Sequence, residues 1–126
     1  MPSPLEEELK LSPYILNALL FGLNRPFNVA LVVLDEVAVT RWAKEKSLDV
    51  RDMTGDTAVK ELIEKELASR AQNFRGYEKP KAFALIREDF TVENGLLTPS
   101  LKVRRKLVLD RYLPLLEALY SSRATS

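Results

Sequence analysis

The sequence feature that most constrains the fold is a continuous apolar run at Val29–Leu34. It reads Val-Ala-Leu-Val-Val-Leu, is rich in β-branched side chains and contains no polar residue. β-branched residues favour extended backbone, and successive side chains of a strand point to opposite faces. A strand without polar positions must therefore be covered on both faces. The sequence predicts such a buried strand at 27–34.

Capping and breaking signals divide the rest of the chain into elements. Ser3 is a suitable helix N-cap that forms a capping box with Glu6, and Asp35 is a second N-cap. Either Asp56 or Thr57 is a third, and Pro114 interrupts the last helical region. Further strands are expected at 18–21 and 82–87, with one short turn of helix at 14–17. Helices are expected at 4–11, 36–46, 57–73, 103–112 and 113–121. The predicted fold class is α+β, with a small, roughly three-stranded sheet, packed helices and a peripheral β-hairpin.

The peripheral hairpin is predicted from the turn residues that follow the last strand. Asn94-Gly95 supplies two residues that tolerate positive φ, as a type I′ turn requires. Pro99 cannot donate a ladder hydrogen bond, so strand pairing is expected to stop near it. Ser100 is a plausible N-cap for the next helix. Lys102 is therefore expected where a loop becomes a helix, exposed to a partner or substrate.

Composition excludes several classes of site. The chain of 126 residues has no cysteine and no histidine, and its formal net charge is +1. It therefore has no thiol nucleophile, no disulfide framework and no imidazole base, and no metal site is predicted. No apolar run approaches the roughly 20 residues that cross a bilayer. The near-zero net charge gives no argument for binding nucleic acid.

Four segments together carry a family resemblance. Residues 93–105 read ENGLLTPSLKVRR, and Tyr112 precedes LEALY at 116–120. Residues 1–6 read MPSPLE, and 13–26 begin and end with proline and contain a glycine. This ordered set resembles the C-terminal part of the long-chain acyl-CoA synthetases, which are AMP-forming adenylating enzymes. The resemblance covers nearly the whole chain.

The resemblance implies roles for two cationic residues. Lys102 matches the family's catalytic lysine, and Arg105 matches an arginine three residues later. Two roles are open for Arg105: it supports catalysis, or it only braces the lid by pairing with Glu117 or a neighbour. Leu101 stands where relatives outside the long-chain group have the glycine of a T-x-x-G-K-x-x-R motif. In these enzymes a fatty acid carboxylate attacks the α-phosphate of ATP, and a fixed ammonium offsets the repulsion between the anions. Without the resemblance, Lys102 would be interpreted as part of a solvated basic helix start with Arg104 and Lys106.

The resemblance also implies a domain organisation. Residues 1–121 are expected to form a C-terminal lid domain that begins just past a hinge, and residues 122–126 a disordered tail. The large N-terminal domain, which binds ATP and the acyl chain, is absent and is the expected partner. The lid reorients between formation of the acyl-adenylate and formation of the thioester. ATP, Mg²⁺ and coenzyme A are implied for the intact enzyme only, and the isolated segment is expected to bind none of them and to be inactive.

No residue is assigned to coenzyme A. Localisation is expected to be cytoplasmic, with peripheral membrane attachment left open. An alternative interpretation is a stand-alone interaction module that binds an acidic partner through the basic cluster Arg104–Lys106. Nucleic acid is a poor candidate for that partner because the net charge is near zero and no exposed aromatic residues are expected among the basic ones.

Overall fold

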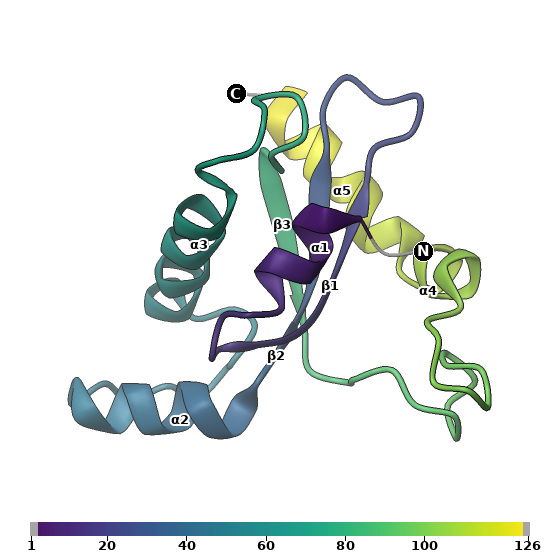
Figure 1. Ribbon diagram of the computed structural model, residues 1–126. Coiled ribbons are helices and arrows are strands. Elements are labelled where there is room, and N and C mark those ends of the chain that lie inside the picture. The colour runs from purple at the N-terminus through teal and green to yellow at the C-terminus, as the bar shows by residue number, and fades with distance from the viewer. Residues whose placement is uncertain (1–2, 125–126) are drawn as a thin grey trace.

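The computed structural model describes residues 3–124 and contains a mixed three-stranded sheet with five helices (Figure 1). The elements in chain order are α1 (Pro4–Leu9), β1 (Ile15–Phe21), β2 (Val29–Leu34), α2 (Glu36–Glu45), α3 (Thr57–Ala71), β3 (Ala82–Ile86), α4 (Arg105–Arg111) and α5 (Leu113–Ala124). The predicted fold class, α+β, is confirmed. Within the described residues, no helix combines the length and apolar character needed to cross a membrane.

The predicted buried strand is the centre of the sheet. β2 pairs antiparallel with β1 on one side and parallel with β3 on the other, so that Leu31 lies between Leu19 and Ala84. Every residue of β2 is fully buried. An apolar run of this kind is stable in water only when both of its faces and both of its edges are covered, and the structure meets this condition.

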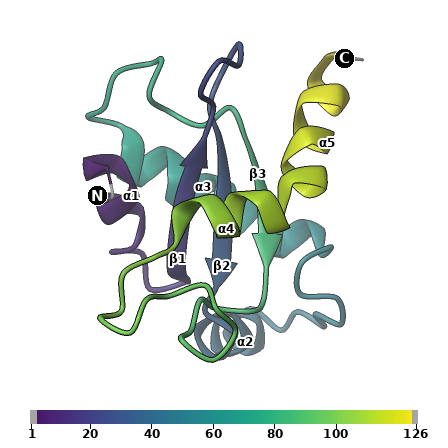
Figure 2. The same ribbon diagram turned by 90° about the vertical axis from the view of Figure 1, so that its right-hand side faces the viewer.

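Two helical layers cover the two faces of the sheet, as the two perpendicular views show (Figures 1 and 2). Ala30, Val32 and Leu34 point into one core, which helices α1, α2 and α3 complete. Val29, Leu31 and Val33 point into the other core, with side chains of α4, α5 and the segment before α4. This division follows directly from the two-residue repeat of a strand.

The predicted helix boundaries are largely confirmed. Ser3 forms a capping box with Glu6, Asp35 accepts a hydrogen bond from the Ala38 amide, and Asp56 accepts one from the Val59 amide. Each cap satisfies a backbone N–H that the first turn of a helix leaves unpaired. The last helical region divides at Tyr112, before Pro114.

Two segments of the chain, residues 14–17 and the end of α5, differ from the sequence prediction. The expected helical turn at 14–17 is wrong, because β1 already begins at Ile15 and pairs with Leu34, with a register irregularity before Asn17. Pairing with β2 satisfies these backbone groups better than one isolated helical turn does. Helix α5 continues to Ala124, into the segment that was expected to be a disordered tail. Residues 125–126 of that segment lie outside the described residues.

Candidate active site

Lys102 lies on a short β-hairpin of residues 97–103, which we call the lysine hairpin. An antiparallel bridge joins Leu97 to Val103. Inside it, the Thr98 amide donates to the Lys102 carbonyl (2.8 Å), and the Leu101 amide donates to the Thr98 carbonyl (2.8 Å). This pattern encloses a three-residue loop, Pro99 to Leu101. The peripheral hairpin therefore exists, but its turn is not the predicted one at Asn94-Gly95.

Asn94-Gly95 instead closes a compact loop before the lysine hairpin. The Asn94 carboxamide oxygen accepts hydrogen bonds from the amides of Thr91 and Leu96, and its nitrogen donates to the Asp89 carbonyl. Only Gly95 of the pair has positive φ (80°), whereas a type I′ turn needs it at both residues. Asn94 therefore has the turn role that its residue type indicates, in a different kind of turn.

Leu101 adopts the left-handed backbone conformation, with φ 65°. The last residue of a three-residue hairpin loop commonly requires this conformation. It costs an L-amino acid with a Cβ about 1–2 kcal/mol, and glycine almost nothing. The glycine of the related motif therefore matches the backbone geometry found here. Leu101 is 69% exposed, so its side chain gains little burial in this domain.

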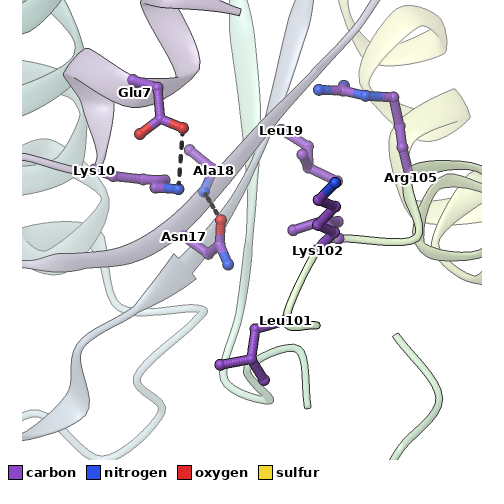
Figure 3. A pocket seen from close by; sticks show the side chains of 9 residues that line it. Glu7, Lys10, Asn17, Ala18, Leu19, Leu101, Lys102 and Arg105 are labelled. Carbon is purple, nitrogen blue, oxygen red and sulfur yellow. Dashed lines mark hydrogen bonds and ion pairs between the residues drawn. The ribbon is translucent and has the colours of Figure 1, made fainter. Parts of the chain in front are cut away.

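The Lys102 side chain is exposed and extends beside a pocket of about 360 Å³ (Figure 3). Among the residues that the structure describes, its ammonium forms no hydrogen bond or ion pair, although its amide donates to the Thr98 hydroxyl (3.1 Å). The pocket is also lined by Lys10, Arg105 and Glu7. Lys10 is paired with Glu7. The arrangement leaves the Lys102 ammonium unpaired beside the hairpin loop, where it can approach an anion.

Arg105 lies in the first turn of α4 and is anchored to Glu6 of α1. The guanidinium makes two hydrogen bonds to the Glu6 carboxylate, one of them 2.8 Å long. Glu6 also accepts from the Leu20 amide on the outer edge of β1 (2.6 Å) and from the Ser3 amide (3.0 Å). Its side chain is only 1% exposed, whereas that of Arg105 is 38% exposed. Glu6 therefore joins α1, the sheet and the beginning of α4.

This contact changes how two sequence-predicted residues are interpreted. Glu6 was expected to cap a helix, and it does, but its partner Arg105 was not anticipated. Glu117, considered as a partner of Arg105, binds Arg25 instead. Arg105 lines the same pocket as Lys102 but is engaged by a buried carboxylate. Whether it also supports catalysis stays a prediction.

The basic cluster Arg104–Lys106 is divided among different surroundings. Arg105 binds Glu6, and Lys106 pairs with Asp110 on its own helix (2.9 Å). Arg104 occupies the N-cap position of α4 and its side chain makes no capping hydrogen bond. The expected N-cap, Ser100, is wrong because it lies inside the hairpin loop. A cluster partly neutralised in this way is a weak surface for an acidic partner, which counts against the interaction-module interpretation.

The surroundings of Glu6 determine its protonation. Burial acts to raise the pKa of the Glu6 carboxyl, but the hydrogen bonds from Arg105 and from the Leu20 and Ser3 amides outweigh it, so the pKa lies below its ordinary value of 4.5. The same pair raises the pKa of Arg105 further. A buried carboxylate that remains charged at neutral pH has a structural role that depends on its partner.

The lowered pKa predicts a specific pH dependence of stability. A carboxyl with a lower pKa in the folded state stabilises the fold above its unfolded pKa, and this contribution disappears as pH falls through the folded pKa. The free energy of unfolding should therefore decrease below about pH 4.5. Urea denaturation from pH 7 to pH 3 would measure it. Glu6→Gln should lack this part of the decrease, and an identical pH profile in that variant would contradict the assignment.

Comparisons with known proteins give the same placement for the chain. Residues 1–124 match the family described as the AMP-binding enzyme C-terminal domain. A long-chain-fatty-acid–CoA ligase of Mycobacterium tuberculosis, FadD15, is 32% identical over 124 residues, covering 95% of this chain and 21% of the relative. The peroxisomal long chain acyl-CoA synthetase 6 of Arabidopsis thaliana is 30% identical over 103 residues, covering 78% of this chain and 15% of the relative.

Solved structures share the fold. The A-PCP didomain of carboxylic acid reductase from Segniliparus rugosus, in complex with AMP, superimposes with a TM-score of 0.78 at 29% identity. That match covers 97% of this chain and 16% of the other. The chain thus spans about a fifth or less of the length of the proteins that it resembles.

Proposed function

Because this chain belongs to the AMP-binding enzyme C-terminal domain family, we propose that it is the mobile lid domain of a long-chain-fatty-acid–CoA ligase and that Lys102 is its catalytic residue. The observation that carries the proposal is the unpaired Lys102 ammonium, which lies on a hydrogen-bonded hairpin beside a pocket. The chain corresponds to a fifth of FadD15. The complete reaction therefore needs the larger N-terminal part, which supplies the remaining substrate contacts.

Lys102 acts in the first half-reaction. A carboxylate oxygen of the fatty acid attacks the α-phosphorus of ATP, the bond to the bridging oxygen breaks, and pyrophosphate leaves. Two anions must approach and negative charge increases around the α-phosphate. A preorganised ammonium stabilises this charge more in the transition state than in the separated reactants. A long side chain ending in a single point charge suits a contact with two different oxygens.

Arg105 and Glu6 hold Lys102 in place. The lysine hairpin ends at Val103, and α4 begins at Arg105, so the Glu6–Arg105 pair fixes the backbone two residues beyond the hairpin. A bidentate pair to a buried carboxylate defines the orientation of that backbone better than a single contact. We therefore assign Arg105 a positioning role.

The side chains present fit an anionic substrate and do not fit a metal ion. The pocket beside Lys102 is lined by Lys10 and Arg105 and by a single carboxylate, Glu7. Within residues 3–124, no three carboxylate or other metal-binding side chains gather in one place. The lid would thus contact the carboxylate and phosphate oxygens, and Mg²⁺ and the acyl chain would be held by the N-terminal part. When bound, coenzyme A supplies the thiol that displaces AMP.

The second half-reaction requires a different arrangement. The thiol must reach the acyl carbonyl where the lysine hairpin previously stood, so we infer that the lid rotates and carries Lys102 away. The loop of the hairpin, Pro99 to Leu101, lies at the edge of the domain (Figure 2), whereas Leu97 and Val103 at its base pack against the second core. Such a placement allows the domain to move as a rigid unit without repacking.

The likeness to solved structures supports a second candidate function, which differs from the first only in the thiol that accepts the acyl group. The solved structures similar to this chain include adenylation domains of carboxylic acid reductases, one of them with its PCP domain. In this alternative the acyl group passes to a thiol on a carrier domain and not to free coenzyme A. Both candidates share adenylate formation by Lys102.

A chimera tests the proposal. The segment of FadD15 that aligns with this chain is replaced by residues 1–126, and FadD15 lacking that segment serves as the negative control. With ATP and palmitate, the chimera should release pyrophosphate and, with coenzyme A, form palmitoyl-CoA. Adenylate formation without transfer to coenzyme A would favour the carrier-domain alternative. A folded chimera that makes adenylate independently of Lys102 would contradict the role of the lysine.

A further inference from the structure

Leu101 has a side chain that the fold of this domain does not explain. The lysine hairpin needs a left-handed residue at this position, and glycine or asparagine would adopt that conformation more easily than leucine. An apolar side chain normally offsets such strain by burial, yet Leu101 is 69% exposed. Its identity therefore points to a contact outside the described residues.

The position of Leu101 limits what this contact can be. Leu101 lines the same pocket as Lys102 and is its neighbour in the chain, so a surface that covers the lysine hairpin must also meet the leucine. Figure 3 shows that the two side chains diverge: Lys102 is directed toward Leu19 and Arg105, and Leu101 points away from them. A Lys102 ammonium aimed at the reacting oxygens therefore leaves the Leu101 side chain aimed at a different part of the surface that covers the hairpin.

We propose that Leu101 is a positioning residue, whose side chain docks into an apolar recess on the N-terminal part of the ligase and seats the lysine hairpin for adenylate formation. This inference rests on the proposed function. The N-terminal part is the occupant because the chain spans only a fifth of FadD15, and the remaining four fifths must surround the substrate that Lys102 reaches. Backbone strain in the free lid is offset on closure, when the leucine becomes buried.

Three substitutions separate the backbone from the side chain. Leu101→Asn relieves the left-handed strain and removes the apolar side chain. Leu101→Ala removes the side chain and retains the strain, and Leu101→Met retains both. In the 126-residue chain alone, Leu101→Asn should raise Tm by about 3–5 °C, whereas the other two should leave it nearly unchanged.

In the chimera with FadD15, the ranking of the variants by activity should be opposite to their ranking by Tm, with Leu101→Asn among the least active. Burial of a leucine side chain corresponds to at least about a tenfold effect on an equilibrium. We expect Leu101→Asn and Leu101→Ala to lower kcat for palmitoyl-adenylate formation about tenfold, with the KM for ATP unchanged. Leu101→Met should stay within about twofold of the unsubstituted chimera. Conversion of supplied palmitoyl-adenylate to palmitoyl-CoA should be unaffected in all three, because the hairpin has then moved away.

Each contrary result overturns the inference in a recognisable way. If Leu101→Asn and Leu101→Ala retain full adenylate formation, no docking contact exists. If their effect changes with acyl chain length between octanoate and palmitate, Leu101 touches the acyl chain and not protein. If the free chain dimerises and Leu101→Asn abolishes the dimer, the occupant is a second copy. The Lys102→Ala chimera identifies failure of the proposed function itself: if it equals the unsubstituted chimera, both proposals fall together.

Discussion

Lys102→Ala should lower the rate of acyl-adenylate formation by about 10²–10³-fold in the chimera with FadD15. The loss follows from removing one preorganised charge aimed at the developing negative charge, an effect of this size at other electrostatic sites. ATP-dependent release of pyrophosphate with palmitate would measure it. Because Lys102 is exposed and its side chain makes no hydrogen bond or ion pair within the described residues, its removal should leave the thermal stability of the chain unchanged.

Two comparisons make this result specific. Lys106→Ala removes a cation from the same basic run, but that ammonium is paired with Asp110, so its adenylation rate should stay near that of the parent. The Lys102→Ala chimera should also convert supplied palmitoyl-adenylate to palmitoyl-CoA at nearly the parental rate. Loss of both half-reactions would mean that the variant is misfolded or that Lys102 does not act on the first step alone.

Arg105→Ala should destabilise the chain by about 2–3 kcal/mol, less than for a fully buried pair because Glu6 keeps two backbone N–H donors. It leaves the Glu6 carboxylate, only 1% exposed, without its charged partner, and an uncompensated buried charge is costly. Glu6→Gln should cost less, because Arg105 is 38% exposed and its guanidinium can turn toward water. The free energy of unfolding in urea at pH 7 would measure both effects.

The double variant Glu6→Gln/Arg105→Met separates the charge from the packing. It removes both charges and retains an apolar stem at position 105, so it should recover much of the loss caused by Arg105→Ala. Glu117→Gln is the matched control, since the Arg25–Glu117 pair is more than a third exposed on the carboxylate side and should contribute no more than about 1 kcal/mol. Equal effects of Arg105→Ala and Glu117→Gln would contradict the structural role of Glu6.

Local signals in the sequence were sufficient for the elements that depend on local chemistry. The apolar run Val29–Leu34 is the central strand, and the N-caps Ser3, Asp35 and Asp56 begin the helices where expected. In each case the deciding interaction is either burial of a continuous apolar segment or a hydrogen bond within three residues. Such interactions can be predicted from residues that are neighbours in the sequence.

Long-range pairing decided the features that sequence patterns did not reveal. Ile15 is extended because it pairs with Leu34 of β2, which its own neighbours do not show. The hairpin turn was assigned to Asn94-Gly95 because glycine normally marks positive φ. Gly95 does have positive φ, but in the lysine hairpin the residue with that conformation is Leu101. The role of Glu6 as an ion-pair partner was missed for the same reason, since a capping box explains the residue locally.

The separation of Glu6 and Arg105 has a consequence for how the chain folds. The two residues stand 99 positions apart, so their contact closes a loop that contains most of the domain, and the entropy of closing it increases with its length. The β1–β2 hairpin and the helices form from nearby residues and are expected to precede this contact. During synthesis from the N-terminus, the Glu6 carboxylate stays without its partner until Arg105 has emerged. Adoption of the final fold is thereby linked to completion of the segment that contains the lysine.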